Sequence, residues 1–237
     1  MPRPTARLPV IRSIAAPAGG TTQRIAASIT TAIVERRLLP GTKLAEQKIA
    51  DIFKVSRTLV RQAFHQLSRD KLVTLEPARG ARVAEPSVEE ARQVFEVRQM
   101  LEAAMIKRAA AELAPAQIAE LRAHLRAEEA AIRRTDVSGR TRLLADFHVV
   151  VATMLGNEVL AQMLGELVSR SSLIALMYQS AHSAEHSSLE HVAIVDALEK
   201  GDARAAARLM QTHLHHVEQN LRLKSRFPNL AAALQPA

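Results

Sequence analysis

The sequence predicts a mainly α protein: an N-terminal winged helix-turn-helix of three helices and a β-hairpin, followed by an all-α antiparallel bundle of about six helices. Three observations predict it. Gly is rare after residue 20 while Ala is abundant, which favours helices. Residues 71–83 interrupt the helical spacing with a strand–turn–strand pattern. The charge is uneven, because residues 1–85 hold 15 basic and 6 acidic residues and residues 86–237 hold 17 and 18.

Composition excludes several classes of protein. With 48% hydrophobic residues, the 237-residue chain can bury one or two ordinary cores. The absence of Cys excludes disulfide frameworks, Cys-ligated zinc, iron–sulfur clusters and thiol catalysis. The uncharged run at residues 171–184 is shorter than the about 20 apolar residues of a membrane span, so we expect no membrane partner. Residues 1–20 lack the apolar stretch of a secretory signal and are expected to be a flexible basic arm.

The first domain is predicted at residues 21–84. Apolar residues at helical spacing indicate a helix at about 21–37, which Leu39-Pro40-Gly41 ends. A short helix follows at 46–53, and a third at about 56–70 should turn Val60, Phe64 and Leu67 inward. Residues 71–75 and 81–83 are the predicted strands, and the Pro and Gly between them suit a tight turn.

The second domain is predicted at residues 88–223, after a linker at 85–87 and before a tail at 224–237. Ser87 and Glu90 have capping-box spacing, so a helix should begin at 88. Gly156 and Gly201 mark helix ends, because Gly readily takes a left-handed conformation. The expected helices are at about 88–113, 116–134, 139–155, 158–180, 185–200 and 203–223.

The basic first domain points to DNA. In a winged helix-turn-helix, the second helix of the motif enters the major groove. Here that helix opens with two hydroxyls and two guanidiniums, and Arg can bond guanine with two hydrogen bonds: Ser56, Arg57, Thr58 and Arg61. Arg79 and Gly80 at the hairpin tip suit a minor-groove contact. The positive charge alone would equally fit a helix face that is exposed to solvent. The order of the helices and strands and the Pro and Gly of the hairpin turn, taken together with the charge, favour binding to DNA.

Residues 41–50, 55–64, 72–73 and 79–83 together resemble the DNA-binding domain of GntR-family bacterial transcription regulators. The resemblance covers about residues 21–84 and implies double-stranded operator DNA as partner, contacted by the six residues named above. Many members have Arg where this chain has Gln47, with Lys48 next. We therefore add Lys48 to the expected DNA contacts.

The second domain is rich in histidine. It lacks a nucleophile elbow, a phosphate loop and a His-Glu-x-x-His motif. A lone His on a helix is more often structural than a ligand, but imidazoles on several helices of one bundle favour a divalent-metal site. The candidates are His148, His182, His186, His191, His213, His215 and His216.

A second resemblance sorts these histidines. Residues 94–102, 146–148, 156–157, 190–198, 201–206 and 210–214 resemble the FCD ligand-binding domain of the same family. It implies that His148, His191 and His213 hold a metal, with zinc first and manganese or nickel as alternatives. The family's Asp ligand precedes the first His by four residues, where this chain has Leu144. Asp146 should point to roughly the opposite side of the helix. The site would then have three His with open positions for water or effector, bind metal weakly, or bind none. If a metal is bound, three neutral ligands would leave cation charge that favours an anionic effector.

A small carboxylate is the expected effector. Arg98 matches a position that often faces the pocket in the family, and a guanidinium can clamp a carboxylate. An ion pair with Glu102 at the protein surface is the competing interpretation. Arg170 and Tyr178 are further candidates for the pocket wall.

These observations predict a ligand-responsive, non-enzymatic transcription regulator, cytoplasmic and nucleoid-associated, that binds palindromic operators as a homodimer. Filling the bundle would shift the helix at 88–113, which follows the wing. One alternative is a metal sensor in which the ion is the effector. A weaker alternative is a metal-dependent hydrolase, which the lack of a placed acid/base partner disfavours.

Overall fold

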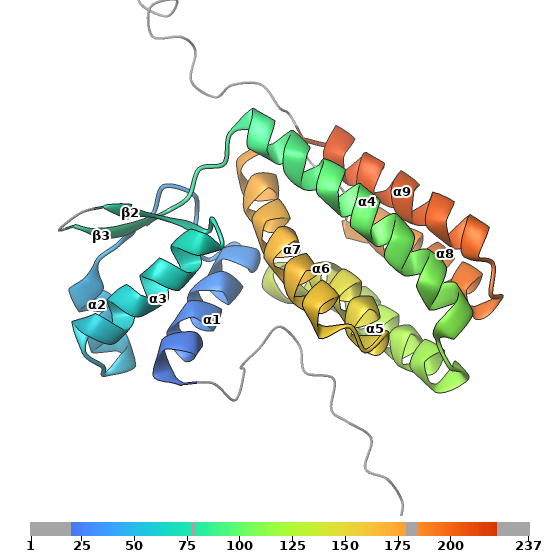
Figure 1. Ribbon diagram of the computed structural model, residues 1–237, viewed down its shortest axis with the longest axis horizontal. Helices are drawn as coiled ribbons and strands as arrows, with labels where there is room; N and C mark the ends of the chain where they lie inside the picture. Colours follow the sequence, from blue (N-terminus) through green and yellow to red (C-terminus); the bar gives the residue numbers. More distant parts are fainter. Residues whose placement is uncertain (1–19, 77–78, 179–183, 222–237) are drawn as a thin grey trace, which may run out of the picture.

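The computed structural model describes residues 20–76, 79–178 and 184–221, and its elements follow the predicted order (Figure 1). The first domain contains α1 (Thr21–Val34), α2 (Glu46–Phe53), α3 (Arg57–Arg69), and the hairpin strands β2 (Val73–Glu76) and β3 (Gly80–Val83). A two-residue strand that the sequence analysis missed, β1 (Lys43–Leu44), completes an antiparallel sheet in the order β1-β3-β2. Residues 1–19 of the expected arm and residues 222–237, with the expected tail, lie outside the described residues.

The core of the first domain explains why these residues form these elements. Val60, Phe64 and Leu67 line the buried face of α3, as their spacing predicts, and pack with residues of α1 and the sheet. Each such side chain contributes about 1.5–3 kcal/mol when removed from water. Ser56 caps α3, because its Oγ accepts a hydrogen bond from the Leu59 amide at 3.5 Å.

The second domain is a bundle of the remaining described helices: α4 (Val88–Glu112), α5 (Pro115–Arg133), α6 (Val137–Met154), α7 (Glu158–Tyr178), α8 (Ala184–Glu199) and α9 (Ala203–Gln219). The most extensively packed pairs are α4 with α9, α6 with α7, and α5 with α6 (Figure 1). Gly156 and Gly201 both have φ +67° and end α6 and α8 as expected. Ser87 caps α4, accepting from the Glu90 amide at 3.0 Å.

Helix α7 joins the two domains. It contacts α1 as well as α4 and α6, and its fully buried Leu173 belongs to the core of the first domain. With a mean hydropathy of 1.3 over its most apolar window, α7 is long and apolar enough to cross a membrane by length and composition alone. Its contacts with α1, α4 and α6 bury only part of that surface, since 33% of the apolar window is buried.

Candidate metal and effector site and candidate DNA interface

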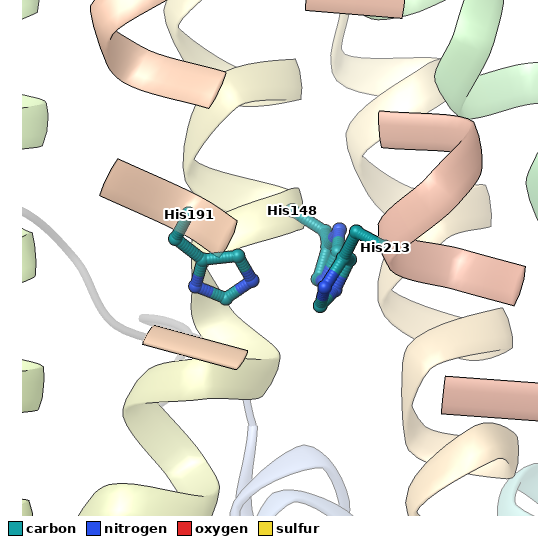
Figure 2. A group of neighbouring side chains, drawn as sticks. All are labelled: His148, His191 and His213. Atoms are coloured by element: carbon teal, nitrogen blue, oxygen red, sulfur yellow. The ribbon is translucent and has the colours of Figure 1, made fainter. Parts of the chain in front are cut away.

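Three buried histidines from three helices meet in the bundle: His148 of α6, His191 of α8 and His213 of α9. Each offers a ligand nitrogen, and these atoms lie within 4.8 Å of one another. Figure 2 shows the rings of His148 and His213 side by side, with His191 approaching from a different helix. Phe147 stacks on His191 at a centroid distance of 4.0 Å and so fixes that ring. The three positions singled out by the resemblance are therefore neighbours in space.

A carboxylate lies behind each imidazole; those of Glu102 and Glu128 are buried, and that of Glu190 is partly exposed. Glu102 contacts Nδ1 of His148, Glu128 lies 3.0 Å from Nδ1 of His191, and Glu190 lies 2.7 Å from Nδ1 of His213. A carboxylate can only accept a hydrogen bond, so in each neutral ring Nδ1 carries the proton and Nε2 keeps its lone pair. Nε2 of His191 is buried with no hydrogen-bond partner in the described structure. This donor set fits a divalent transition metal.

The protonation states also suit a cation. Burial lowers the pKa of His148 to about 4 and that of His213 to about 3, although Glu102 and Glu190 partly oppose the shift. Burial would raise the pKa of Glu102, but the charges of Arg98 and His148 and their hydrogen bonds lower it to about 2. Both imidazoles are therefore neutral near pH 7, while Glu102 is ionised.

The side chains near the missing Asp ligand lie as the helical spacing predicts. Leu144 faces the cavity beside the histidines. Asp146 is buried elsewhere, with Oδ1 lacking a hydrogen-bond partner among the described residues. Burial raises the pKa of Asp146 to about 6, against the opposing charges of His124 and Arg142. Asp146 is not part of the histidine group.

A cavity of about 160 Å³ adjoins the histidines. Its volume resembles that of the roughly 150 Å³ cavity known to admit benzene, so it suits a small metabolite. Arg98 lines it and is 4% exposed. Nε of Arg98 donates to Glu102 at 2.7 Å, whereas Nη2 has no hydrogen-bond partner among the described residues. The ion pair between Arg98 and Glu102 is therefore buried and not at the surface. Arg98 can form this pair and still offer Nη2 to a carboxylate in the cavity.

The other two candidate effector residues lie away from this cavity. Arg170 of α7 pairs with Glu90 of α4 at 2.7 Å. Tyr178 donates its hydroxyl hydrogen to the carbonyl oxygen of Pro86 at 2.8 Å. Neither lines the cavity. Of the three residues predicted, Arg98 alone lies on its wall, because the other two fasten α7 to the start of α4.

The sequence analysis missed several residues of the site. Glu102, Glu128 and Glu190 support the imidazoles, and Arg36 and Arg140 line the cavity. Glu102 and Glu190 lie in stretches that carry the FCD resemblance, whereas Arg36 follows the end of α1 and has no sequence signal beyond its charge. Glu190 also contacts His186 and His216, forming a second, more exposed group that could hold a metal. His215 is exposed and His182 lies outside the described residues.

The candidate DNA contacts gather at the start of α3. Arg57 and Arg61 are exposed and share Glu46 of α2, with Nη2 of each guanidinium 3.0 and 2.9 Å from Oε2. Both line a groove that extends to Gly80 of the wing. Thr58, Lys48 and Arg79 are exposed, and Ser56 caps the helix. Residues 77 and 78 of the hairpin turn lie outside the described residues.

Gly80 has a structural reason to be glycine. Its φ is +96°, and an added Cβ would lie 2.4 Å from the carbonyl oxygen of Leu44. The close approach of β3 to β1 therefore excludes a side chain whether or not Gly80 touches DNA.

Comparison with known proteins agrees with this architecture. Residues 21–83 match the family described as bacterial regulatory proteins, gntR family, and residues 93–216 match the FCD domain. The HTH-type transcriptional repressor RspR of Escherichia coli K12 is 28% identical over 191 residues, covering 80% of this chain and 84% of that protein. NanR, a repressor of Citrobacter rodentium, is 28% identical over 200 residues, covering 73% and 74%.

Two solved structures are similar in fold. A GntR transcriptional regulator from Rhodococcus sp. RHA1 superposes with a TM-score of 0.75 at 25% identity, covering 87% of this chain and 99% of that one. McbR/YncC of E. coli has a TM-score of 0.74 at 21% identity, covering 85% and 98%. The second likeness concerns the fold alone.

Proposed function

Because this chain belongs to the gntR family of bacterial regulatory proteins and is a transcription regulator with an FCD domain, not an enzyme, we propose that a small carboxylate controls its affinity for operator DNA. We propose further that the carboxylate acts in the FCD cavity together with a histidine-bound divalent cation. One observation carries the proposal: three imidazoles line the same cavity as Arg98, whose Nη2 has no hydrogen-bond partner among the described residues.

His148, His191 and His213 would hold the cation, which when bound supplies a positive centre beside the cavity. Residues of the chain orient the ligands and bind the carboxylate. Glu102, Glu128 and Glu190 orient the imidazoles and keep their protons on Nδ1. Arg98 is held at Nε by Glu102, which leaves its other nitrogens to bind a carboxylate. Glu102 therefore supports both the metal ligand and the anion-binding residue.

On the DNA side, we propose that Arg57, Thr58 and Arg61 read the major groove, while Ser56, Lys48, Arg79 and Gly80 position the helix and wing. A two-fold dimer would place two such helices on the halves of a palindrome. The carboxylate must bind the DNA-competent and DNA-incompetent arrangements unequally to have an effect. That two relatives are named repressors supports repression as the mode of action.

Zinc titration of chelator-treated protein tests the metal site. We expect about one zinc per chain, lost in His191→Ala and kept in His215→Ala, whose side chain is exposed two residues beyond His213. A stoichiometry below about half a site per chain would contradict the proposal. A thermal-shift screen of small carboxylates, with and without zinc, then tests the effector, since a ligand that binds the folded state stabilises it.

A metal sensor is the second candidate. It is favoured by Leu144, because a site without the family's carboxylate should release its ion more readily. Operator binding that responds to zinc alone, with no change on adding any carboxylate, would select this alternative.

A further inference from the structure

The wall of the cavity includes a residue of the DNA-binding domain. Arg36 follows α1 of the winged helix, yet it lines the same cavity as Arg98 and the three histidines. Arg140, in the first turns of α6, lies on the same wall. The cavity is therefore bounded by both domains, and a ligand within it can touch both.

The backbone at Arg36 is unusual for its residue type. Its φ is +61°, a left-handed conformation just after the end of α1, where Gly or Asn is the ordinary choice. A long cationic side chain there costs about 1 kcal/mol more than Gly would. Lys54 after α2 and Lys71 after α3 have the same conformation, at φ +54° and +59°, so the place of Arg36 on the cavity wall, and not its backbone, indicates a role for its side chain.

The adjacent residue anchors this segment to the bundle. The carbonyl oxygen of Glu35 accepts a hydrogen bond from Oγ of Ser138, and its Oε1 accepts one from Nη1 of Arg142, both at 3.2 Å. Leu173 of α7 is fully buried in the core of the winged helix. Arg36 is thus held against α6 by a specific contact between the domains.

One face of α6 lines the cavity, through Val137, Arg140, Thr141, Leu144, Ala145 and His148. Arg140 precedes His148 by two turns, which separates their backbones by about 12 Å. Positive charge is therefore found near the histidines, at Arg98, and toward the start of α6, at Arg36 and Arg140. No carboxylate lines the cavity among the residues that the structure describes. The pKa of Arg36 is lowered, first by burial and then by the charge of Arg140.

We propose that the effector is a small dianion, one acidic group of which binds Arg98 beside the histidines while the other binds Arg36 and Arg140. The inference rests on the proposed function, because it takes this cavity as the effector site. Such a ligand connects the two domains directly. It would favour the arrangement in which the winged helix is docked on α6 and α7. Binding of the effector in the cavity would then change DNA affinity through these contacts as well as through a shift of α4.

Calorimetric titration of the zinc-loaded full chain with malonate, succinate and glutarate, and with the monocarboxylates propionate and butyrate, tests the proposal. We expect at least one dicarboxylate to bind about tenfold or more tightly than the monocarboxylates. Arg36→Gln should weaken that dicarboxylate by about tenfold and leave the monocarboxylates unchanged. Arg98→Lys should weaken both classes, because it removes the bidentate guanidinium.

Arg24→Gln is the matched control, since Arg24 is an exposed Arg of α1 that does not line the cavity. It should leave all affinities unchanged. Hydrogen exchange gives a second measurement: the dicarboxylate should protect residues 35–42 in the unmodified chain but not in Arg36→Gln. Equal affinity for both classes, or a dicarboxylate affinity indifferent to Arg36→Gln, would overturn this inference while leaving the effector site intact. Binding of neither class, or binding unaffected by Arg98→Lys, would instead overturn the proposed function.

Discussion

The carboxylate of Glu102 on α4 contacts Nδ1 of His148 on α6, and both side chains are almost completely buried. The other oxygen of Glu102 accepts the hydrogen bond from Arg98. A single carboxylate thus links the helix that follows the DNA-binding domain to the histidine cluster and to the cavity wall. Removing the charge of Glu102 should therefore affect α4, the histidine cluster and the cavity wall.

Glu102→Gln should weaken zinc binding by about 10–100-fold, because the imidazole loses the carboxylate that orients it. Competition with a chromophoric chelator measures the zinc affinity. Glu112→Gln is the matched control, since Glu112 forms an exposed pair with Arg108 on the same helix. An unchanged zinc affinity in Glu102→Gln would show that the carboxylate does not support the site.

Leu144→Asp should raise zinc affinity by about tenfold or more, because it adds an anionic ligand one turn before His148. The same change should weaken carboxylate binding, since the new charge offsets that of the cation. Zinc titration and calorimetry measure the two effects. Asp146→Asn should alter neither, because Asp146 is not in the histidine group.

Asp146 should make stability depend on pH. Its pKa is raised to about 6 in the folded chain, chiefly by burial, so the folded state holds its proton more tightly than the unfolded state does. Stability therefore falls as pH rises from about 4 to 6, by on the order of 3 kcal/mol in full. Asp146→Asn should stabilise the chain at pH 8 and not at pH 3.5.

Denaturant unfolding across this pH range measures the effect. Glu96→Gln, an exposed change on α4, should shift the unfolding midpoint little at any pH. If the difference in unfolding free energy between Asp146→Asn and the unmodified chain stays constant from pH 3.5 to 8, titration of this carboxyl does not cause the pH dependence.

Arg57→Ala should weaken specific operator binding by about 1–3 kcal/mol and relax sequence preference. Glu46→Gln should raise affinity for random DNA and reduce discrimination, because Glu46 holds both Arg57 and Arg61 and offsets their charge. Anisotropy titrations on specific and random duplexes separate these effects. Equal losses for Arg57→Ala on both duplexes would identify a phosphate contact, and a flat dependence on salt would contradict the basic groove.

Gly80→Ala should destabilise the wing more than Gly156→Ala destabilises the bundle. Both glycines have positive φ, at +96° and +67°, but an added Cβ meets the Leu44 carbonyl oxygen at 2.4 Å in the first and nothing within 4 Å in the second. Gly156→Ala therefore costs only the conformational strain, about 1 kcal/mol. Thermal unfolding of the two variants gives the comparison, and equal losses would show that the contact with Leu44 relaxes.

Much of the fold could be predicted because it follows from local spacing. Helix α2 begins and ends at the predicted residues, and the other helices differ from prediction by a few residues at their ends. Strand β1 was missed because two residues carry no period of their own and pair only with a distant strand. The histidines were found through a resemblance, since their separation along the chain hides their proximity.

The sequence by itself determined the order of the elements, the family, and the residues that can supply positive charge or an imidazole, because these depend on residue type and near-neighbour spacing. Tertiary structure decided which polar atoms meet. Glu102 and His148 are 46 residues apart, and Glu128 and His191 are 63 apart, so only packing pairs them. Packing also brings Arg36 of the winged helix to the effector cavity and leaves Nη2 of Arg98 without a hydrogen-bond partner among the described residues, because both depend on contacts between helices far apart in the sequence.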